Sequence, residues 1–167
     1  MFLLFFYDIM IFLTVIGGVM ALGKQAKTIN DKQAKAVLNH LADARYPERD
    51  RGVFLLSIKA GLRSKEIANL TWAMVTDSDA KIADVIAVQN VASKGKNGGR
   101  EIPVHPVLKD ALVDLQIHRG DLAVPDRPVV YSERGSGMSA NSVTVWFHRL
   151  YKGLGMEGCS SHSGRRT

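Results

Sequence analysis

Residues 60–72, AGLRSKEIANLTW, decide how the fold of this 167-residue chain is interpreted. Gly61 is typical of a helix end, and SKEIANL has the composition of a short helix, so Arg63 is expected at a junction between two helices. A glutamate three residues later, Glu66, lies one turn away from Arg63. The two side chains can form an ordinary surface pair, or Glu66 can orient the Arg63 guanidinium toward an external anion. This stretch alone leaves both interpretations open.

Helical patterns lie upstream of this junction. Residues 31–44 are expected to form a helix that Thr28 or Asn30 caps, and a second helix is expected to start at Pro47, because proline suits the first turn. The first helix has an apolar stripe of Ala34, Val37, Leu38 and Leu41, and the second turns inward Val53, Phe54, Leu55 and Ile58.

Two further helices are expected downstream. Pro106 starts one that runs through residues 107–118, and Ser139 or Asn141 caps another that runs through residues 142–154. The buried face of the first is expected to be Val107, Leu108, Leu112 and Leu115.

Between these helical regions the pattern becomes strand-like. The segments MVTD (74–77), KIADVIAVQNVA (81–92) and REIPVH (100–105) are rich in Val and Ile, and turn residues separate them. A short extended piece is also expected at residues 129–131. The predicted fold class is therefore α+β, mainly α with a small three-stranded antiparallel sheet.

The turn between the last two strand segments contains Lys94 and Lys96 within SKGKNGG. Such a turn is often simply solvated. If it contacts DNA, a flexible β-hairpin can place an ammonium beside a phosphate. The turn lacks the G-x-x-x-x-G-K-[ST] spacing and the following helix of a nucleotide-binding loop.

Residues 160–167, SSHSGRRT, combine His162 with Arg165 and Arg166. This stretch is expected to open a helix, and a spacing of three puts His162 and Arg165 on one face of it. Both side chains can donate hydrogen bonds to an anion. A histidine in such a position can also be incidental.

Composition narrows the classes of partner. The net charge is +6 and the isoelectric point about 9.6, which is compatible with nucleic acid or an anionic surface. The single cysteine, Cys159, excludes an intrachain disulfide and fits a cytoplasmic, reducing location. The five histidines have no metal-binding spacing, so no metal is expected.

Residues 1–22 are almost wholly apolar and reach the length of about 20 residues that a membrane helix needs. Asp8 interrupts the run, and no basic residue precedes it as in a signal peptide. Three interpretations stay open: translation that truly starts at Met20, a membrane anchor, and a buried core helix.

Taken together, GLRSKE with its L-T-W step, the hairpin SKGKNGGREIPV and the HSGRR box resemble, in this order, the catalytic domain of tyrosine recombinases, the phage integrase family. The resemblance covers residues 28–167. It implies site-specific recombination and DNA integration through a phosphotyrosine intermediate, without a cofactor. The catalytic residues that it implies are Arg63, Lys94, His162 and Arg165, with Glu66 as acidic support and Lys96 as the alternative hairpin lysine.

The chemistry that the resemblance implies explains these residue types. When a tyrosine attacks a phosphodiester, negative charge builds on the nonbridging oxygens, and two guanidiniums can neutralise it. Lys94 would protonate the leaving 5′ oxygen, and His162 would bind the phosphate or accept the nucleophile's proton. The partner is double-stranded DNA, and family members are expected to assemble as tetramers on paired sites. The expected DNA contacts are Arg63, Lys94, Lys96, Arg100, Arg165 and Arg166.

The family pattern continues beyond the HSGRR box to a nucleophilic tyrosine. The four tyrosines of this chain, at positions 7, 46, 131 and 151, all precede the box. The expectation is therefore a catalytic domain that is incomplete at its C-terminus and cannot complete strand cleavage alone. A non-catalytic DNA-binding remnant and a membrane-anchored interaction protein are the alternatives.

Overall fold

The computed structural model of the chain describes residues 26–89 and 99–164. Within these ranges the protein is mostly helical with a small antiparallel sheet, as predicted. The elements in chain order are α2 (Asp31–Ala42), α3 (Pro47–Ile58), α4 (Ser64–Ala68), the 3-10 helix η1 (Trp72–Met74), β1 (Val85–Val88), β2 (Arg100–Pro103), α5 (Pro106–Arg119), the 3-10 helix η2 (Gly120–Leu122) and α6 (Ala140–Gly153).

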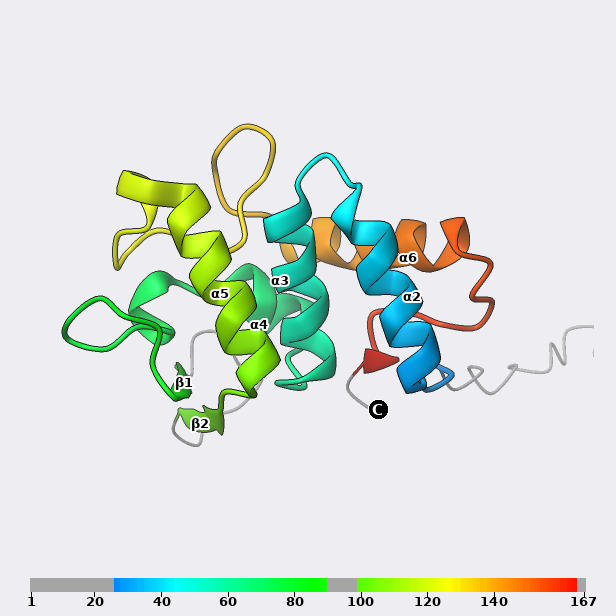
Figure 1. Cartoon of the computed structure of the whole chain (residues 1–167), viewed down its shortest axis with the longest axis horizontal. Coiled ribbons are helices and arrows are strands. Elements are labelled where there is room, and N and C mark those ends of the chain that lie inside the picture. Colours follow the sequence, from blue (N-terminus) through cyan, green and yellow to red (C-terminus); the bar gives the residue numbers. More distant parts are fainter. Residues whose placement is uncertain (1–25, 90–98, 165–167) are drawn as a thin grey trace, which may run out of the picture.

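Helix α3 is the centre of the core. It lies between α2 and α5, while α6 crosses behind and the β1–β2 pair lies near the start of α5 (Figure 1). Most of its length is buried, including the six consecutive residues 52–57. A helix that is apolar and buried on nearly all sides must be covered by other elements. The packing around α3 therefore fixes where its C-terminal end, and the chain that follows, can lie.

The helix starts agree with the sequence. Asn30 caps α2, because its side chain accepts a hydrogen bond from the Gln33 amide (2.8 Å) and the Gln33 side chain accepts one from the Asn30 amide (3.1 Å). Pro47 and Pro106 lie in the first turns of α3 and α5. Such starts are local features, which is why the sequence predicted them.

One core assignment was wrong. Val107 is exposed rather than buried, and Ala111 joins the core instead. The buried face of α5 follows positions 108, 111, 112 and 115. Val107 lies one residue, about 100° of rotation, away from the start of that face.

The prediction of a three-stranded sheet was also wrong for the described residues, which contain two strands. β1 and β2 pair antiparallel with Val85 opposite Pro103 and Val88 opposite Arg100. The segment predicted as the first strand, residues 74–77, instead contains the last residue of η1 and a single bridge between Thr76 and Ile82. A tight turn interrupts it, since the Asp77 carboxylate accepts hydrogen bonds from the amides of Asp79 and Lys81, both at 2.9 Å.

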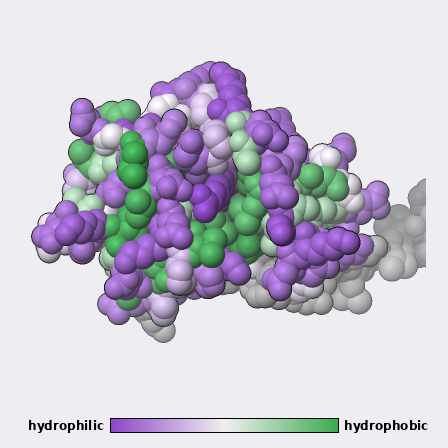
Figure 2. All heavy atoms as spheres, in the orientation of Figure 1, coloured by the Kyte–Doolittle hydropathy of each residue, from purple (hydrophilic) through white to green (hydrophobic). Residues whose placement is uncertain are grey.

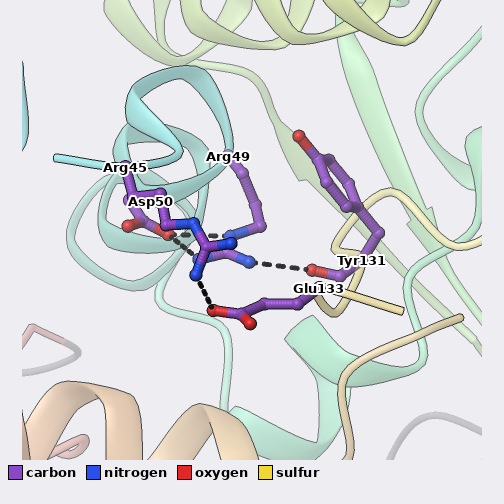
Figure 3. Close-up of polar contacts among 5 residues, drawn as sticks. All are labelled: Arg45, Arg49, Asp50, Tyr131 and Glu133. Carbon is purple, nitrogen blue, oxygen red and sulfur yellow. Dashed lines mark hydrogen bonds and ion pairs between the residues drawn. The ribbon is translucent and has the colours of Figure 1, made fainter. Parts of the chain in front are cut away.

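A buried charge cluster joins the first turn of α3 to the loop after residue 130 (Figure 3). Arg49 donates to Asp50 Oδ1 (2.8 Å) and to the carbonyl of Tyr131 (3.3 Å). The Arg49 guanidinium also lies over the Tyr46 ring, 4.2 Å from its centroid. At the rim, Arg45 pairs with Glu133 at 3.2 Å.

None of the described helices combines the length and apolar character needed to cross a bilayer. Residues 1–22, for which an anchor was one of three interpretations, lie outside the described residues.

Candidate functional site

Arg63 occupies the junction between α3 and α4, as the sequence predicted. Gly61 has a φ of 63°, a left-handed conformation that glycine adopts without strain. The fully buried Leu62 follows, and its amide donates to the Leu56 carbonyl at 3.1 Å. Arg63 is then extended and precedes the first residue of α4. The core thus anchors the residue immediately before Arg63 and leaves the guanidinium at the surface.

Glu66 is the buried centre of the site. Its side chain is 1% exposed, and its Oε2 accepts a hydrogen bond from the Arg63 amide at 2.7 Å. Its Oε1 lies 3.4 Å from Arg63 Nη1, and its Oε2 lies 3.1 Å from Arg100 Nη2. A buried carboxylate needs such partners, because an unpaired buried charge is costly.

The two arginines around this carboxylate remain partly open to solvent. The side chain of Arg63 is 43% exposed and that of Arg100 is 42% exposed. Two positive charges share one buried negative charge, so the cluster carries an excess positive charge at the surface. The solvent-exposed N–H groups of these guanidiniums can bind an anion such as a phosphate.

The β-pair brings Arg100 to Glu66. Arg100 is the first residue of β2 and lies opposite Val88, whose side chain is buried. At Gly99, a Cβ atom would lie 2.8 Å from the Val88 carbonyl oxygen. Glycine is therefore required where β2 begins. The sequence offered only the Gly-Gly pair before Arg100 as a signal for this close approach.

His162 is the exposed residue of a turn that is otherwise buried and whose backbone is held by serines. Its amide donates to Ser160 Oγ (3.2 Å), and the Ser160 amide donates to Ser163 Oγ (2.9 Å). The predicted helix opening is seen as this turn, within residues 161–164.

Gly164 allows the turn to pack closely against the last part of α3. A Cβ atom there would lie 2.5 Å from Ser57 Oγ and 2.8 Å from Ile58 Cγ2. Because Arg63 follows α3 after a short connection, both Arg63 and the His162 turn are attached to the same end of this helix. Sequence reasoning did not identify Ser57 or Gly164 as supporting residues, since their contact is long-range.

Four of the predicted site residues lie outside the described residues. They are Lys94, Lys96, Arg165 and Arg166. The structure thus brings together Arg63, Glu66 and Arg100, and describes His162 on its own turn.

The described tyrosines are engaged elsewhere. Tyr131 and Tyr151 are buried, and burial raises the pKa of both phenols. Tyr46 packs edge to face on Tyr131 with ring centroids 6.4 Å apart. These three side chains belong to the packing of the domain, and Tyr7 lies outside the described residues.

Within the described ranges, no group of three or more potential metal ligands is close enough to hold an ion. A groove of about 670 Å³ lies between α2, α3 and α5. On the face of the molecule seen in Figure 2, hydrophilic and hydrophobic residues alternate. In the groove, Arg51 already pairs with Asp114 (2.7 Å), and the carboxylate of Glu48 lies 3.7 Å from His118 Nδ1. The groove is therefore less suited to binding an anion than the cluster of Arg63, Glu66 and Arg100.

Solved structures share this fold. The Tn1549 transposon integrase in complex with transposon right end DNA matches with a TM-score of 0.66 at 18% identity, over 84% of this chain and 51% of that one. The XerA recombinase matches with a TM-score of 0.64 at 20% identity, over 84% of this chain and 48% of that one. A lambda integrase dimer bound to a COC′ core site gives 0.60 at 17% identity, over 84% and 39% of the two chains.

The chain spans about half the length of the first two of these structures. No curated protein matches its sequence at a significant level. The family model described as "Phage integrase family" matches residues 27–167, which is most of the chain. The chain belongs to the phage integrase family.

Proposed function

We propose that this chain provides the phosphate-binding part of a site for DNA strand cleavage and rejoining through a phosphotyrosine intermediate, in site-specific recombination or DNA integration. The observation that carries the proposal is the cluster of Arg63 and Arg100 on the buried Glu66 carboxylate. A surface guanidinium held from behind by a buried acid is suited to binding a phosphodiester oxygen.

In this proposal Arg63 and Arg165 stabilise the charge that develops on the nonbridging oxygens of the reacting phosphate. Lys94, or Lys96 in its place, protonates the leaving 5′ oxygen, and a positioned acid contributes about 10²–10⁴ in rate. His162 binds the phosphate or accepts the proton of the nucleophile. Arg166 contacts the DNA backbone beside the site.

The nucleophilic tyrosine of the proposed reaction is not Tyr131 or Tyr151. Their side chains are buried in the core, and a raised pKa makes the phenolate nucleophile harder to form. We expect the nucleophile to lie outside the described residues.

The partner in the proposal is double-stranded DNA. Two solved relatives support it: a Tn1549 transposon integrase bound to transposon right end DNA, and a lambda integrase tetramer bound to a Holliday junction. By analogy we propose that this protein also assembles on paired DNA sites. We also propose a cytoplasmic location, with which a DNA partner and the single cysteine are compatible.

Duplex DNA binding tests the proposal. The full chain should bind a duplex, and affinity should fall steeply with salt because Lys and Arg release counterions from phosphates. Arg63→Met should weaken binding about 10- to 100-fold, the range for a hydrogen bond to a charged group, and lower the salt slope by about 0.9.

The matched control is Arg134→Met, which removes the same charge from an exposed loop. It should change affinity far less than Arg63→Met. Equal effects of the two substitutions, or no binding of the full chain at low salt, would overturn the proposal.

A further inference from the structure

Arg100 has a distinctive relation to the rest of the site. Arg100 belongs to the strand β2, whereas Arg63 and Glu66 belong to the α3–α4 junction. Glu66 and Arg100 are 34 residues apart in the sequence. Glu66 Oε2 accepts hydrogen bonds from both the Arg63 amide (2.7 Å) and Arg100 Nη2 (3.1 Å). One buried oxygen atom thus joins two separate elements.

We propose that Arg100 is a positioning residue of the site, which acts through Glu66 to hold the Arg63 guanidinium in place. The inference rests on the function proposed above only for the identity of the anion, a DNA phosphate. It concerns Arg63, Glu66 and Arg100 alone.

The geometry of the carboxylate supports this role. Glu66 is 1% exposed, so its two oxygens depend on protein donors rather than water. Oε1 faces the Arg63 side chain at 3.4 Å, a loose contact, while Oε2 is held more closely by the Arg63 amide and by Arg100. Rotation of the carboxylate, and with it the position of Oε1, is therefore limited by the partners of Oε2.

The pairing of β2 with β1 holds the backbone of Arg100 in a defined position, so its side chain can restrain the Glu66 carboxylate. β2 begins at Arg100 in register with the buried Val88 of β1, and Ile102 lies opposite the buried Ile86. The close contact at Gly99 also limits how the backbone enters β2. A guanidinium is planar and presents its donors in a fixed fork, so it restrains an acceptor better than an ammonium does.

The test combines DNA affinity with a signal from Arg63 itself. Arg100→Met should weaken duplex binding about 10-fold, as expected for the loss of a hydrogen bond to a charged group, but should have less than about a twofold effect in the Arg63→Met background. The Nε–Hε resonance of Arg63 in ¹⁵N NMR spectra should shift in Arg100→Met without DNA. Compared with Arg100→Met, Arg100→Lys should restore part of the duplex affinity and part of the original position of the Arg63 resonance.

A direct contact of Arg100 with DNA would give a different result. The effects of Arg63→Met and Arg100→Met on affinity would then add, and the Arg63 resonance would stay unchanged. That outcome would overturn the inference. Arg134→Met again serves as the matched control, with no change at the Arg63 resonance.

Two further measurements keep the test decisive. If Arg100→Met fails to fold, Glu66→Gln replaces it, because it keeps the shape of the side chain and removes the charge that both arginines share. Glu66→Gln should shift the Arg63 Nε–Hε resonance and weaken duplex binding, with less than about a twofold further effect in the Arg63→Met background. An unchanged resonance, or effects on affinity that add, would contradict the inference. If the full chain binds no DNA, the proposed function fails, while the NMR shift still tests Arg100.

Discussion

At the scale of single residues, the candidate site depends on a few residues that support its charged groups from within the protein. Glu66 binds the Arg63 backbone and two guanidiniums, and Gly164 allows the His162 turn to lie against α3. Supporting residues of this kind set the geometry of charged groups at the surface.

Gly164→Ala should lower the free energy of unfolding by about 1–3 kcal/mol, the usual cost of overpacking a tight contact. The new methyl group would lie 2.5 Å from Ser57 Oγ, which is too close for any real contact. Urea unfolding followed by circular dichroism measures the change.

The double variant Ser57→Ala/Gly164→Ala should recover part of this loss, because Ser57 Oγ is the nearest obstructing atom and has no hydrogen-bond partner among the described residues. Gly153→Ala is the control, since a Cβ there meets nothing within 4 Å. If Gly164→Ala were as stable as Gly153→Ala, the close packing of the turn on α3 would be wrong.

At the scale of elements, the buried pair of Arg49 and Asp50 ties the start of α3 to the loop that contains Tyr131. Burial raises the pKa of the Asp50 carboxyl, and the charge and hydrogen bond of Arg49 oppose that rise. Removal of one partner from such a pair leaves an uncompensated buried charge.

Arg49→Met should therefore lower the free energy of unfolding by about 3–5 kcal/mol at neutral pH. Without Arg49 the pKa of Asp50 in the folded state rises further above its unfolded value. The folded variant then binds a proton more readily than the unfolded chain, so it regains stability as the pH falls from neutral through that folded pKa. The deficit relative to the unsubstituted protein should narrow over this range.

Urea unfolding at a series of pH values between about 7 and 5 measures this prediction. Arg45→Met is the control, because its partner Glu133 is exposed and surface pairs contribute about 0–1 kcal/mol. A deficit of Arg49→Met that stays constant with pH would mean that Asp50 does not titrate in the way that its burial implies.

At the scale of the whole molecule, the domain is organised around α3. Its residues 52–57 are buried, and α2, α4 and α5 all pack against it (Figure 1). The Arg63 junction and the His162 turn are both attached to its C-terminal end. The stability of the site therefore depends on the stability of the core.

Native-state hydrogen exchange should show this dependence. The amides of residues 54–57 in α3 should exchange only through global unfolding, whereas those of η2, which has no buried residue, should exchange through local opening. The comparison of both groups across increasing urea, followed by NMR, gives the opening free energies. Slower exchange in η2 than in α3 would contradict the central place of α3.

Local patterns allowed much of the fold to be predicted. Proline in the first turn, the Asn30 cap and the helical stripes each depend on neighbouring residues, so the helix starts at residues 31, 47 and 106 followed from the sequence. The proposed third strand did not, since β-propensity in residues 74–77 was overridden by the turn that Asp77 stabilises. Whether Val107 was buried depended on the exact face that α5 presents to α3.

The sequence by itself determined the family resemblance, the order of the motifs and the pairing of Arg63 with Glu66 one turn later. It did so because these are properties of short segments. Only the tertiary structure decided that Arg100 shares the Glu66 carboxylate and that Gly164 rests on Ser57. These contacts join residues far apart in the chain, and their distances follow from how α3 is packed and how β2 is registered on β1.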